Sequence, residues 1–405
     1  MHSSTSPSER GLTGTREGAL PPGLRKTAAD RPGQAQPVPT RDIPTRPWVK
    51  MGLFVLCAVT VLTFAWEWNA RTNVGLRAGD IGDGPQAWAE SRRVADLAAV
   101  AIIGDSRILF DTDQARFQAL TGIRPVQVGH VGTNARPLLE HFANDSNFHG
   151  LLIVGIADTM YFGMPVIGLG GDAVHNYAKY DKPSQLTGLW LDRWLQRYFA
   201  FMDSDYRLSR QAIRFDDGWR KGVDSPYEDV WKISETFPGR QYFMWDRIES
   251  DAYLRGHARH AWDGFKGPNI PPPLADKVIA RTAEAVRRIR ARGGDVIFVR
   301  PPSAPQLRVN EQKRIPRALG WDRLMVGARV KGVHADDLPQ AQNLLIPEWS
   351  HLSRKCAAVF TDAYVRRLAE LTPRLKLRVD APPPLSRADC VPHDVASVKG
   401  RRAQL

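Results

Sequence analysis

The stretch Val100-Ala-Ile-Ile-Gly104-Asp105-Ser106-Arg107-Ile-Leu-Phe110 decides the fold that we expect for this chain. Its first four residues are Val, Ala and Ile, which is typical of a short buried strand. Gly104 and Asp105 interrupt the run, and Ser106 opens a segment with apolar residues at helical spacing. A serine at such a turn lies at the carboxyl edge of a sheet, where α/β proteins place their ligands. Ser106 is therefore a candidate nucleophile, and the alternative is an ordinary helix N-cap.

The alternation of strand and helix patterns continues along the chain. We expect strands at 98–103, 124–128, 150–155 and 295–299, and helices at 107–120, from 137, at 280–291 and up to about 371. We expect loops and short helices over 303–345. This order predicts an α/β domain over residues 95–372, with a parallel sheet and helices on both faces.

Residues 160–273 interrupt this pattern and are rich in Trp, Tyr and Arg. Leu191, Trp194, Leu195 and Tyr198 fall at helical spacing, so we expect a helical insertion. Two interpretations stay open. The aromatic side chains pack into a core of the insertion itself, or they form a cap that shapes a substrate groove or rests on a membrane surface.

The N-terminal region predicts a membrane anchor. Residues 1–47 are rich in Ser, Thr, Pro, Gly and Arg and are expected to be a disordered cytoplasmic tail. The span 48–68 contains an uncharged apolar run from Met51 to Trp66, and its flanking tryptophans are placed like interfacial anchors. Arg41, Arg46 and Lys50 precede this run, so the positive-inside rule places the N-terminus in the cytoplasm and the main domain in a bacterial periplasm. A cleaved signal peptide and a buried soluble helix are the alternatives. Residues 69–94 are expected to be a linker.

Composition narrows the function classes. The chain has 405 residues and a formal net charge of +13. Residues 1–50 and 374–405 each contribute +4, so the middle of the chain is only mildly basic. No basic helix with interleaved aromatic residues and no zinc-finger spacing is visible, which argues against nucleic-acid binding. The residue spacing suggests no metal site, and we expect no cofactor.

The cysteines and the C-terminal tail leave one question open. Cys57 lies in the apolar span, whereas Cys356 and Cys390 would both be exported. These two are either a disulfide that ties the C-terminal tail to the last helix or two free thiols. Residues 373–405 form a Pro-rich, basic tail that we expect to be loosely ordered.

A nucleophilic serine needs a base and a charge partner. His351 is the candidate base, because it precedes the final helix at the end of the α/β pattern. Glu348 lies three residues earlier, where a carboxylate can hydrogen-bond the imidazole and set its tautomer. The alternative for an isolated Glu-x-x-His is a surface loop.

Gly104-Asp105-Ser106 after the first strand, together with Glu348-Trp-Ser-His351 before the last helix, resembles the GDSL/SGNH hydrolase superfamily. The resemblance covers about 95–160 and 275–372 and is nearest to membrane-anchored bacterial members linked to cell-surface polysaccharide modification. It implies a flavodoxin-like sheet and a triad of Ser106, His351 and Glu348. The family usually has Asp where this chain has Glu348.

The resemblance also implies an oxyanion hole made by the N–H groups of Ser106 and Gly132. Ala157 stands where the family has an asparagine that donates to the oxyanion. Asn134 and Arg300 are the candidates to replace it. Arg300 and Asp105 are candidates for substrate binding, and Asp105 is also suited to hold its turn through backbone hydrogen bonds.

The function expected from these observations is that of a serine esterase or O-acyltransferase anchored in the inner membrane. Its substrates would be acyl esters, acetyl above all, of an exported or cell-envelope polysaccharide, and a membrane-bound acyltransferase is an expected partner. One alternative is a catalytically weak or inactive envelope protein that binds glycan or a membrane partner. A lipid esterase at the bilayer surface is another.

Overall fold

The computed structural model describes residues 24–25, 38–39, 47–144, 147–163, 169–180, 182–216, 232–262 and 267–391. The chain divides into two units, Met1–Phe64 and Ala65–Leu405. In the first unit, strands β1 (Leu24–Arg25) and β2 (Val38–Pro39) form an antiparallel pair. Helix α1 (Trp48–Asn69) begins in this unit, and the rest of the description concerns the second unit.

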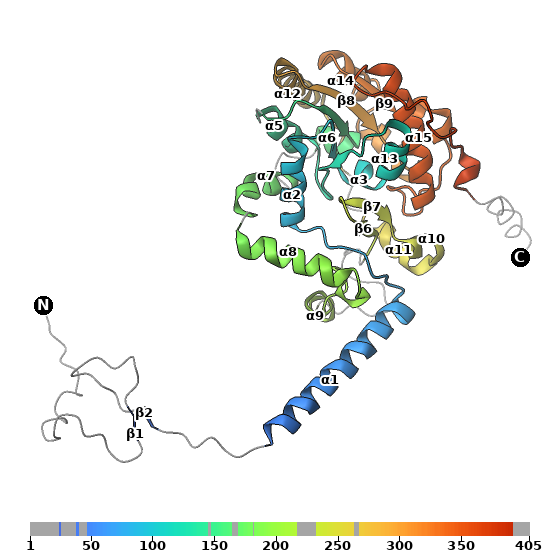
Figure 1. The fold of residues 1–405 in the computed structure, drawn as a ribbon. Coiled ribbons are helices and arrows are strands. Elements are labelled where there is room, and N and C mark those ends of the chain that lie inside the picture. Colours follow the sequence, from blue (N-terminus) through green and yellow to red (C-terminus); the bar gives the residue numbers. More distant parts are fainter. Residues whose placement is uncertain are drawn as a thin grey trace, which may run out of the picture. The chain divides into compact units, whose positions relative to one another are not determined.

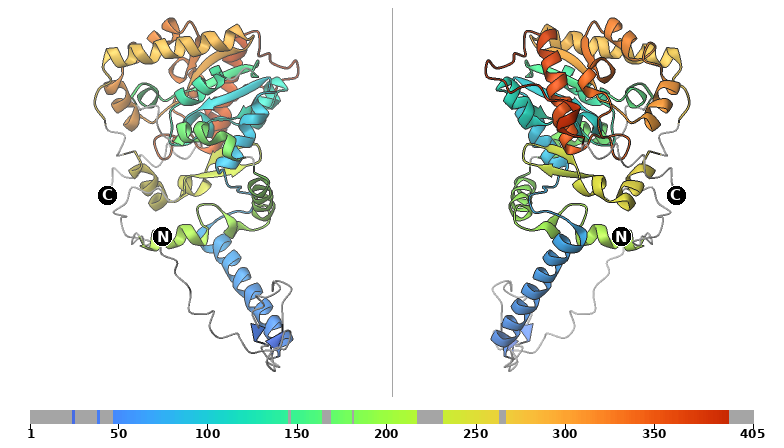
Figure 2. Two further views of the ribbon diagram at one scale, coloured as in Figure 1. Left: turned by 90° about the vertical axis from the view of Figure 1, so that its left-hand side faces the viewer. Right: turned by 90° about the vertical axis from the view of Figure 1, so that its right-hand side faces the viewer.

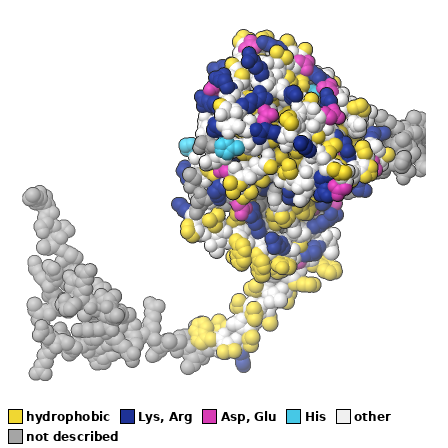
Figure 3. All heavy atoms as spheres, turned by 45° about the horizontal axis from the view of Figure 1, so that its top comes forward, with side chains coloured by type: hydrophobic (Ala, Val, Ile, Leu, Met, Phe, Trp, Pro, Cys, Tyr) yellow, Lys and Arg dark blue, Asp and Glu magenta, His cyan; other side chains and the backbone are white. Residues whose placement is uncertain are grey.

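Helix α1 has no buried residue along its 22 residues. By length and composition, the continuous helix Trp48–Val74 is long and apolar enough to cross a membrane. Figure 3 shows its surface as a run of apolar side chains.

A five-stranded parallel sheet forms the centre of the second unit, as the alternating sequence pattern predicts (Figure 1). Its strands are β3 (Val100–Gly104), β4 (Val126–Gln127), β5 (Leu151–Gly155), β8 (Asp295–Arg300) and β9 (Lys331–His334). The spatial order is β4-β3-β5-β8-β9, and each neighbouring pair is parallel. Strand β9 lies in the region expected to hold only loops and short helices. It has four residues and only two are buried, so the sequence lacks the apolar run of a central strand.

Helices cover both faces of the sheet (Figure 2). The helices of the α/β core are α3 (Ser106–Phe110), α4 (Gln114–Thr121), α5 (Arg136–Asn144), α12 (Pro272–Ala291), α13 (Pro305–Arg314), α14 (Trp321–Gly327) and α15 (Arg354–Leu371). Side chains alternate along the strands, so that Ala101 and Ile103 join the core beneath α5, α12 and α14, whereas Val100 and Ile102 join the core beneath α4 and α15. The helix expected over 107–120 is two helices, since Asp111 and Asp113 occupy the C-cap of α3 and the N-cap of α4.

The expected linker 69–94 is instead part of the folded unit. It contains the π-helical turn η2 (Ala70–Val74) and most of helix α2 (Pro85–Ala95). Trp88 and Arg92 are almost fully buried, and Trp88 Nε1 donates to Val128 O at 3.0 Å. The sequence did not predict this packing, because residues 79–84 are rich in glycine and the segment folds by packing onto the sheet.

The insertion is mixed rather than helical. Its helices are α6 (Asp158–Gly163), α7 (Leu169–Asn176), α8 (Pro183–Gln196), α9 (Leu208–Asp216), α10 (Asp246–Ser250) and α11 (Ala252–His260), with the 3-10 turns η3 (Tyr177–Tyr180) and η4 (Ala200–Met202). An antiparallel hairpin joins β6 (Ser234–Phe237) to β7 (Gln241–Met244). Gly239 and Arg240 adopt positive φ in the turn of this hairpin. Helical periodicity in the sequence does not indicate such a turn.

The C-terminal tail is ordered as far as the structure describes it. Leu375 is fully buried, and Cys356 of α15 forms a disulfide with Cys390, which follows the 3-10 turn η8 (Arg387–Asp389). Of the two interpretations left open for these cysteines, the structure has the disulfide. The expectation of a loosely ordered tail is therefore wrong for residues 373–391, and residues 392–405 lie outside the described part.

Two glycines allow α3 to begin directly at the sheet edge. Gly104 and Gly155 are partners across β3 and β5, and Gly104 has φ +153°. A Cβ at Gly155 would lie 2.1 Å from Ile108 Cβ, and a Cβ at Gly104 would lie 2.5 Å from Gly155 O. The side chain of Ile108 therefore packs against the strand ends, in space that a side chain at either glycine position would fill.

Gly155→Ala is expected to lower the free energy of unfolding by about 1–3 kcal/mol, because neither the strand nor α3 can move away from the added methyl group. Gly256→Ala in α11 is the matched control, since a Cβ there meets nothing within 4 Å. It should be neutral or raise the stability by about 0.5–1 kcal/mol. Thermal and urea unfolding of the detergent-solubilised chain measure both. Equal stability of the two variants would contradict the close approach of α3.

Cys390→Ala is expected to lower the free energy of unfolding by about 3–4 kcal/mol, as loop-entropy arguments give for a link of this length. The linked residues are 34 positions apart. Addition of a reductant should destabilise the wild type and Cys57→Ser alike and leave Cys390→Ala unchanged. A wild type whose unfolding ignores the reductant would refute the disulfide.

Candidate active site at the carboxyl edge of the sheet

Ser106 lies at the point where the strand order of the sheet reverses. After β3 the chain adds β4 on one side of it and then β5 on the other side. In open α/β sheets, ligands bind outside the carboxyl ends of the strands at such a switch point. Ser106 is the first residue of α3 and is partly exposed. The structure thus places it where the sequence predicts.

Asp105 holds this turn together and is buried. Its Oδ1 accepts a hydrogen bond from Arg107 N at 3.0 Å, which makes it the N-cap of α3. Its Oδ2 accepts from Ala157 N at 2.6 Å. Burial raises the pKa of Asp105, and Arg107 with the two backbone donors acts against that rise. These contacts match one role considered for Asp105, which is to hold its turn through backbone hydrogen bonds.

Glu348 and His351 form a buried pair, as their spacing predicts. Glu348 Oε1 lies 3.1 Å from His351 Nδ1 and also accepts from the backbone N–H groups of Ser350 and His351. Glu348 Oε2 accepts from Trp262 Nε1 at 2.6 Å. Both carboxylate oxygens are therefore engaged, and Glu348 fixes the orientation of the imidazole. The alternative of an exposed surface loop is wrong, since both side chains are fully buried.

Helix α3 contacts the segment that carries His351. Arg107 Nε donates to Ser350 Oγ at 3.1 Å, and Asp111 Oδ1 accepts from Leu352 N at 2.8 Å. The ring of Phe110 stacks on the ring of His351 with centroids 4.2 Å apart. Three side chains of the helix that begins at Ser106 thus contact residues 350–352. This contact brings the two candidate catalytic residues to the same edge of the sheet.

The imidazole of His351 is enclosed on two sides. Phe110 stacks on it, and the ring of Trp262 lies 5.5 Å away by centroid. Nε2 of His351 is buried and has no hydrogen-bond partner among the described residues. Ser106 and His351 are accordingly not hydrogen-bonded to each other in this structure. A buried imidazole nitrogen without a partner is costly, so Nε2 is a position where a hydroxyl group would be stabilised.

The candidate oxyanion-hole residues differ in their surroundings. The N–H of Ala157, at the position of the family asparagine, is occupied by Asp105. Gly132 is exposed in the loop that follows β4 and has φ +63°. Asn134 is buried, and its Oδ1 accepts from Arg136 N at 3.0 Å at the start of α5. The side-chain carbonyl of Asn134 thus caps the start of α5.

Arg300, the other candidate substitute, is part of a buried network of charges. Its Nε donates to Asp158 Oδ2 at 3.0 Å and its Nη2 to Glu311 Oε2 at 2.5 Å. Glu311 Oε1 accepts from Arg107, so that this one carboxylate joins two guanidinium groups. Burial would raise the pKa of Glu311, but Arg107 and Arg300 outweigh it and lower the pKa to about 2. Arg300 is 2 % exposed, so its contacts are to the protein rather than to a site open to solvent.

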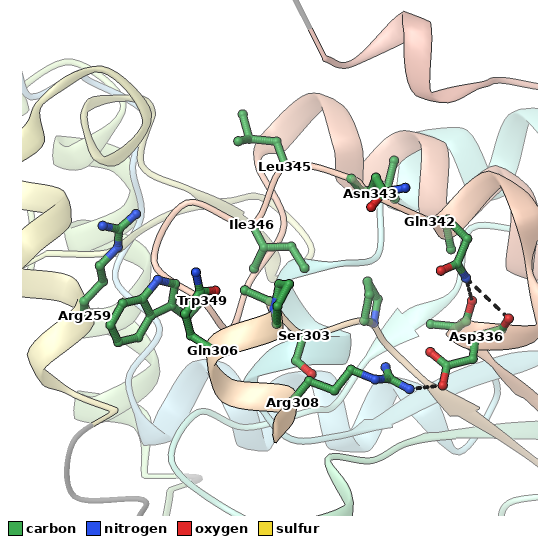
Figure 4. Close-up of a pocket in the computed structure, with 16 residues that line it drawn as sticks. Arg259, Ser303, Gln306, Arg308, Asp336, Gln342, Asn343, Leu345, Ile346 and Trp349 are labelled. Atoms are coloured by element: carbon green, nitrogen blue, oxygen red, sulfur yellow. Dashed lines mark hydrogen bonds and ion pairs between the residues drawn. The ribbon is translucent and has the colours of Figure 1, made fainter. Parts of the chain in front are cut away.

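A cavity of about 330 Å³ lies next to this edge (Figure 4). Its lining includes Ser303, which donates to Glu311, and Trp349, which lies between Glu348 and Ser350 in sequence. Figure 4 shows Trp349 and Arg259 together on one side and Asn343 on another. The lining contains neither Ser106 nor His351. The cavity therefore adjoins the loop of the candidate base without including the candidate nucleophile.

Four residues of the site have no role in the sequence prediction. Arg107 belongs to the opening stretch and Asp111 directly follows it, and a charge in or next to this short apolar helix was the available signal. Burial raises the pKa of Asp111 well above its usual range, which favours the protonated carboxyl. Glu311 and Trp262 carry no local signal, because their partners are distant in sequence. Within the described residues, no group of three or more His, Cys, Asp or Glu side chains is arranged to hold a metal ion.

Glu311→Gln is expected to lower the free energy of unfolding at pH 7 by about 3–5 kcal/mol, because it leaves two buried guanidinium groups short of their shared carboxylate. The pKa of Glu311 lies below its usual value of 4.5, so the charged form stabilises the fold above pH 4.5 and this stabilisation is lost as the pH falls toward 2. The difference between wild type and variant should shrink over that range. Glu370→Gln removes an exposed pair with Arg367 and should change the stability by less than about 1 kcal/mol. A Glu311→Gln variant as stable as this control at pH 7 would contradict the network.

No protein-family model matches this chain, and neither a curated protein nor a solved structure matches it. The resemblance to the GDSL/SGNH superfamily therefore remains an expectation drawn from the two short motifs. What the chain shows by itself is an α/β unit with a five-stranded parallel sheet and one N-terminal helix apolar enough to span a membrane.

Proposed function

We propose that the chain is a membrane-anchored serine esterase or O-acyltransferase whose reacting groups are Ser106, His351 and Glu348. The observation that carries the proposal is the buried Glu348–His351 pair, whose remaining nitrogen, Nε2, has no partner among the described residues. The helix that begins at Ser106 holds the loop of this pair through Arg107, Phe110 and Asp111. The strand order, 2-1-3-4-5 when the strands are numbered within the sheet, supports a flavodoxin-like, SGNH-type fold.

The reaction follows from these positions. Ser106 Oγ attacks the carbonyl carbon of an ester, His351 Nε2 accepts the hydroxyl proton, and Glu348 stabilises the imidazolium. The protonated His351 then returns the proton to the leaving alcohol, which leaves an acyl group on Ser106. Water as the second acceptor regenerates the serine and makes the protein an esterase. A sugar hydroxyl makes it an acyltransferase.

Two features of the unliganded site must change when substrate binds. The proposal requires a hydrogen bond between Ser106 Oγ and His351 Nε2, and such bonds are often absent or long before substrate arrives. It also requires donors for the oxyanion, which we assign to the N–H groups of Ser106 and Gly132 with help from Asn134. Ala157 supplies no donor while Asp105 occupies its N–H.

The proposed setting is the periplasmic side of a bacterial inner membrane, with the N-terminus in the cytoplasm. Arg41, Arg46 and Lys50 before the apolar run support this orientation. The Cys356–Cys390 disulfide supports an oxidising compartment. From the resemblance, the substrate class is acyl esters of an exported or cell-envelope polysaccharide, and a membrane-bound acyltransferase is a partner that would supply acyl groups.

A second candidate function is that of a non-catalytic envelope protein that binds glycan or a membrane partner. Complete burial of His351 beneath Phe110 and Trp262 favours it, because a general base must reach its substrate. A lipid esterase is a variant of the first proposal. It differs by a preference for long-chain over acetyl esters.

Ser106→Ala is expected to abolish labelling by a fluorophosphonate probe and to lower p-nitrophenyl acetate turnover by at least about a thousandfold. Glu348→Gln should lower kcat by about a hundredfold to ten-thousandfold, since the imidazole loses its orienting charge. Ser250→Ala, at an exposed serine of α10, is the control and should match the wild type.

The outcomes separate the candidates. A wild type that neither reacts with the probe nor hydrolyses acetyl or long-chain esters supports the non-catalytic function and overturns the enzymatic one. Labelling that survives in Ser106→Ala would place the nucleophile elsewhere. Turnover of long-chain esters alone would favour the lipid esterase.

A further inference from the structure

Helix α8 presents an exposed aromatic stripe to solvent. Leu186, Trp190, Trp194 and Tyr198 follow one another at intervals of four residues, so they lie along one side of the helix and its C-terminal turn. Trp190 is 66 % exposed and Trp194 is 45 % exposed. Large aromatic side chains are seldom left this open on a protein that has nothing to cover them.

Of the two interpretations left open for these aromatic residues, packing into a core of the insertion is therefore wrong for Trp190 and Trp194. The side of the helix that faces the protein carries Gln196, which is buried, and polar contacts. Arg193 pairs with Glu90 of α2 at 2.5 Å, and Asp192 pairs with Arg207 at 2.8 Å. The polar groups thus hold α8 on the domain, and the aromatic groups point away from it.

Helix α9 adds apolar and basic groups to the same part of the insertion. Leu208 and Ile213 are exposed there. Arg197, after α8, and Arg210, on α9, are exposed and have no side-chain partner among the described residues. Figure 3 shows Lys and Arg side chains interspersed among other types over the visible face of the second unit. An apolar stripe with exposed arginines beside it is the composition of a helix that lies on an anionic lipid surface.

The insertion is tied directly to the last turn of the apolar helix. Glu67 of α1 accepts hydrogen bonds from Ala200 N at 3.0 Å and Phe201 N at 3.1 Å. Arg71 donates to Tyr198 O at 3.0 Å, and the rings of Trp66 and Phe201 lie 6.4 Å apart. These contacts join the residue that ends the apolar run to the segment that directly follows α8.

The junction is packed as well as hydrogen-bonded. Ala70, Val74 and Leu76 are buried in one cluster with Ala200 and with Trp245, at the end of the hairpin. A buried cluster of this kind holds its members in a fixed arrangement. The chain that leaves α1 is thus fixed to the insertion rather than joined to it by a flexible linker. Residues 198–201 thus contact the residues at which the apolar run ends.

We propose that the aromatic face, defined as Leu186, Trp190, Trp194, Tyr198 and Leu208, binds the surface of the bilayer that holds α1, with Arg197 and Arg210 against anionic lipid headgroups. Trp and Tyr prefer the headgroup level of a bilayer, and an Arg close to the surface is attracted to an anionic leaflet. This surface fixes the tilt of the α/β unit over the membrane. The inference rests on the anchoring proposed for α1 and is independent of Ser106 and His351.

The test uses the full-length chain reconstituted in vesicles. Leu186→Cys in a Cys57→Ser background carries a nitroxide spin label, and Val326→Cys on α14, whose side chain is 79 % exposed, is the matched control. Collision rates of the label with oxygen and with a nickel chelate report its depth in the bilayer. In vesicles of phosphatidylcholine with phosphatidylglycerol, the oxygen-to-nickel ratio at position 186 should exceed that at position 326 several-fold.

Two further variants sharpen the test. Trp190→Ser with Trp194→Ser should lower the ratio at position 186 toward that of the control. Arg197→Glu with Arg210→Glu should remove the difference between vesicles with and without phosphatidylglycerol. Because these side chains are exposed, circular dichroism and thermal unfolding should match the wild type.

Equal ratios at positions 186 and 326 would overturn the proposal. So would spin–spin broadening between labels on two chains, which would show that a second copy covers the face. Protection that appears only when soluble glycan is added would assign the face to a carbohydrate and overturn it too. None of these readouts depends on ester hydrolysis, so a failed esterase assay and a failed depth measurement are distinguishable.

Discussion

The approach of helix α3 to the sheet depends on two positions that have no side chain. Gly104 and Gly155 face each other across β3 and β5, and Ile108 occupies the space that a Cβ at either position would take. A helix that begins this close to the strand ends places Arg107, Phe110 and Asp111 within reach of the segment 350–352, more than 240 residues away along the chain. The geometry around Ser106 thus depends on backbone packing before it depends on any polar group.

Buried charged side chains also connect the elements at the same edge of the sheet. Glu311 joins Arg107, which follows β3, to Arg300, at the end of β8, so one carboxylate connects two strands and helix α13. Such a network is weak evidence for stability in itself, but removing one member leaves uncompensated charge in the interior. Because nearly every polar group here is engaged, the few that lack a partner among the described residues mark the places for chemistry. One of them is His351 Nε2, in the segment that contacts the helix beginning at the partly exposed Ser106.

The insertion links this edge to the end of the apolar helix α1. Trp262, just beyond α11, hydrogen-bonds Glu348, and Tyr242 of β7 packs against Phe110 with centroids 5.5 Å apart. The same insertion packs residues 200–201 against the end of α1. It therefore contacts both the candidate active site and the candidate anchor. If the aromatic face of α8 lies on the bilayer, the edge that carries Ser106 has a defined orientation toward whatever reaches the membrane surface.

The sequence by itself determined the elements with strong local patterns: the apolar helix, the buried strands β3, β5 and β8, and the proximity of Glu348 to His351, which are only three residues apart. It did not reveal β9, the hairpin or the docking of residues 69–94, because their stability comes from neighbours rather than from their own composition. Only the tertiary structure decided that Asp105 occupies the N–H of Ala157, that Glu311 lies between two arginines, and that the tryptophans of α8 face outward. Those contacts join residues tens to hundreds of positions apart, and local periodicity contains no information on which distant partner a side chain meets.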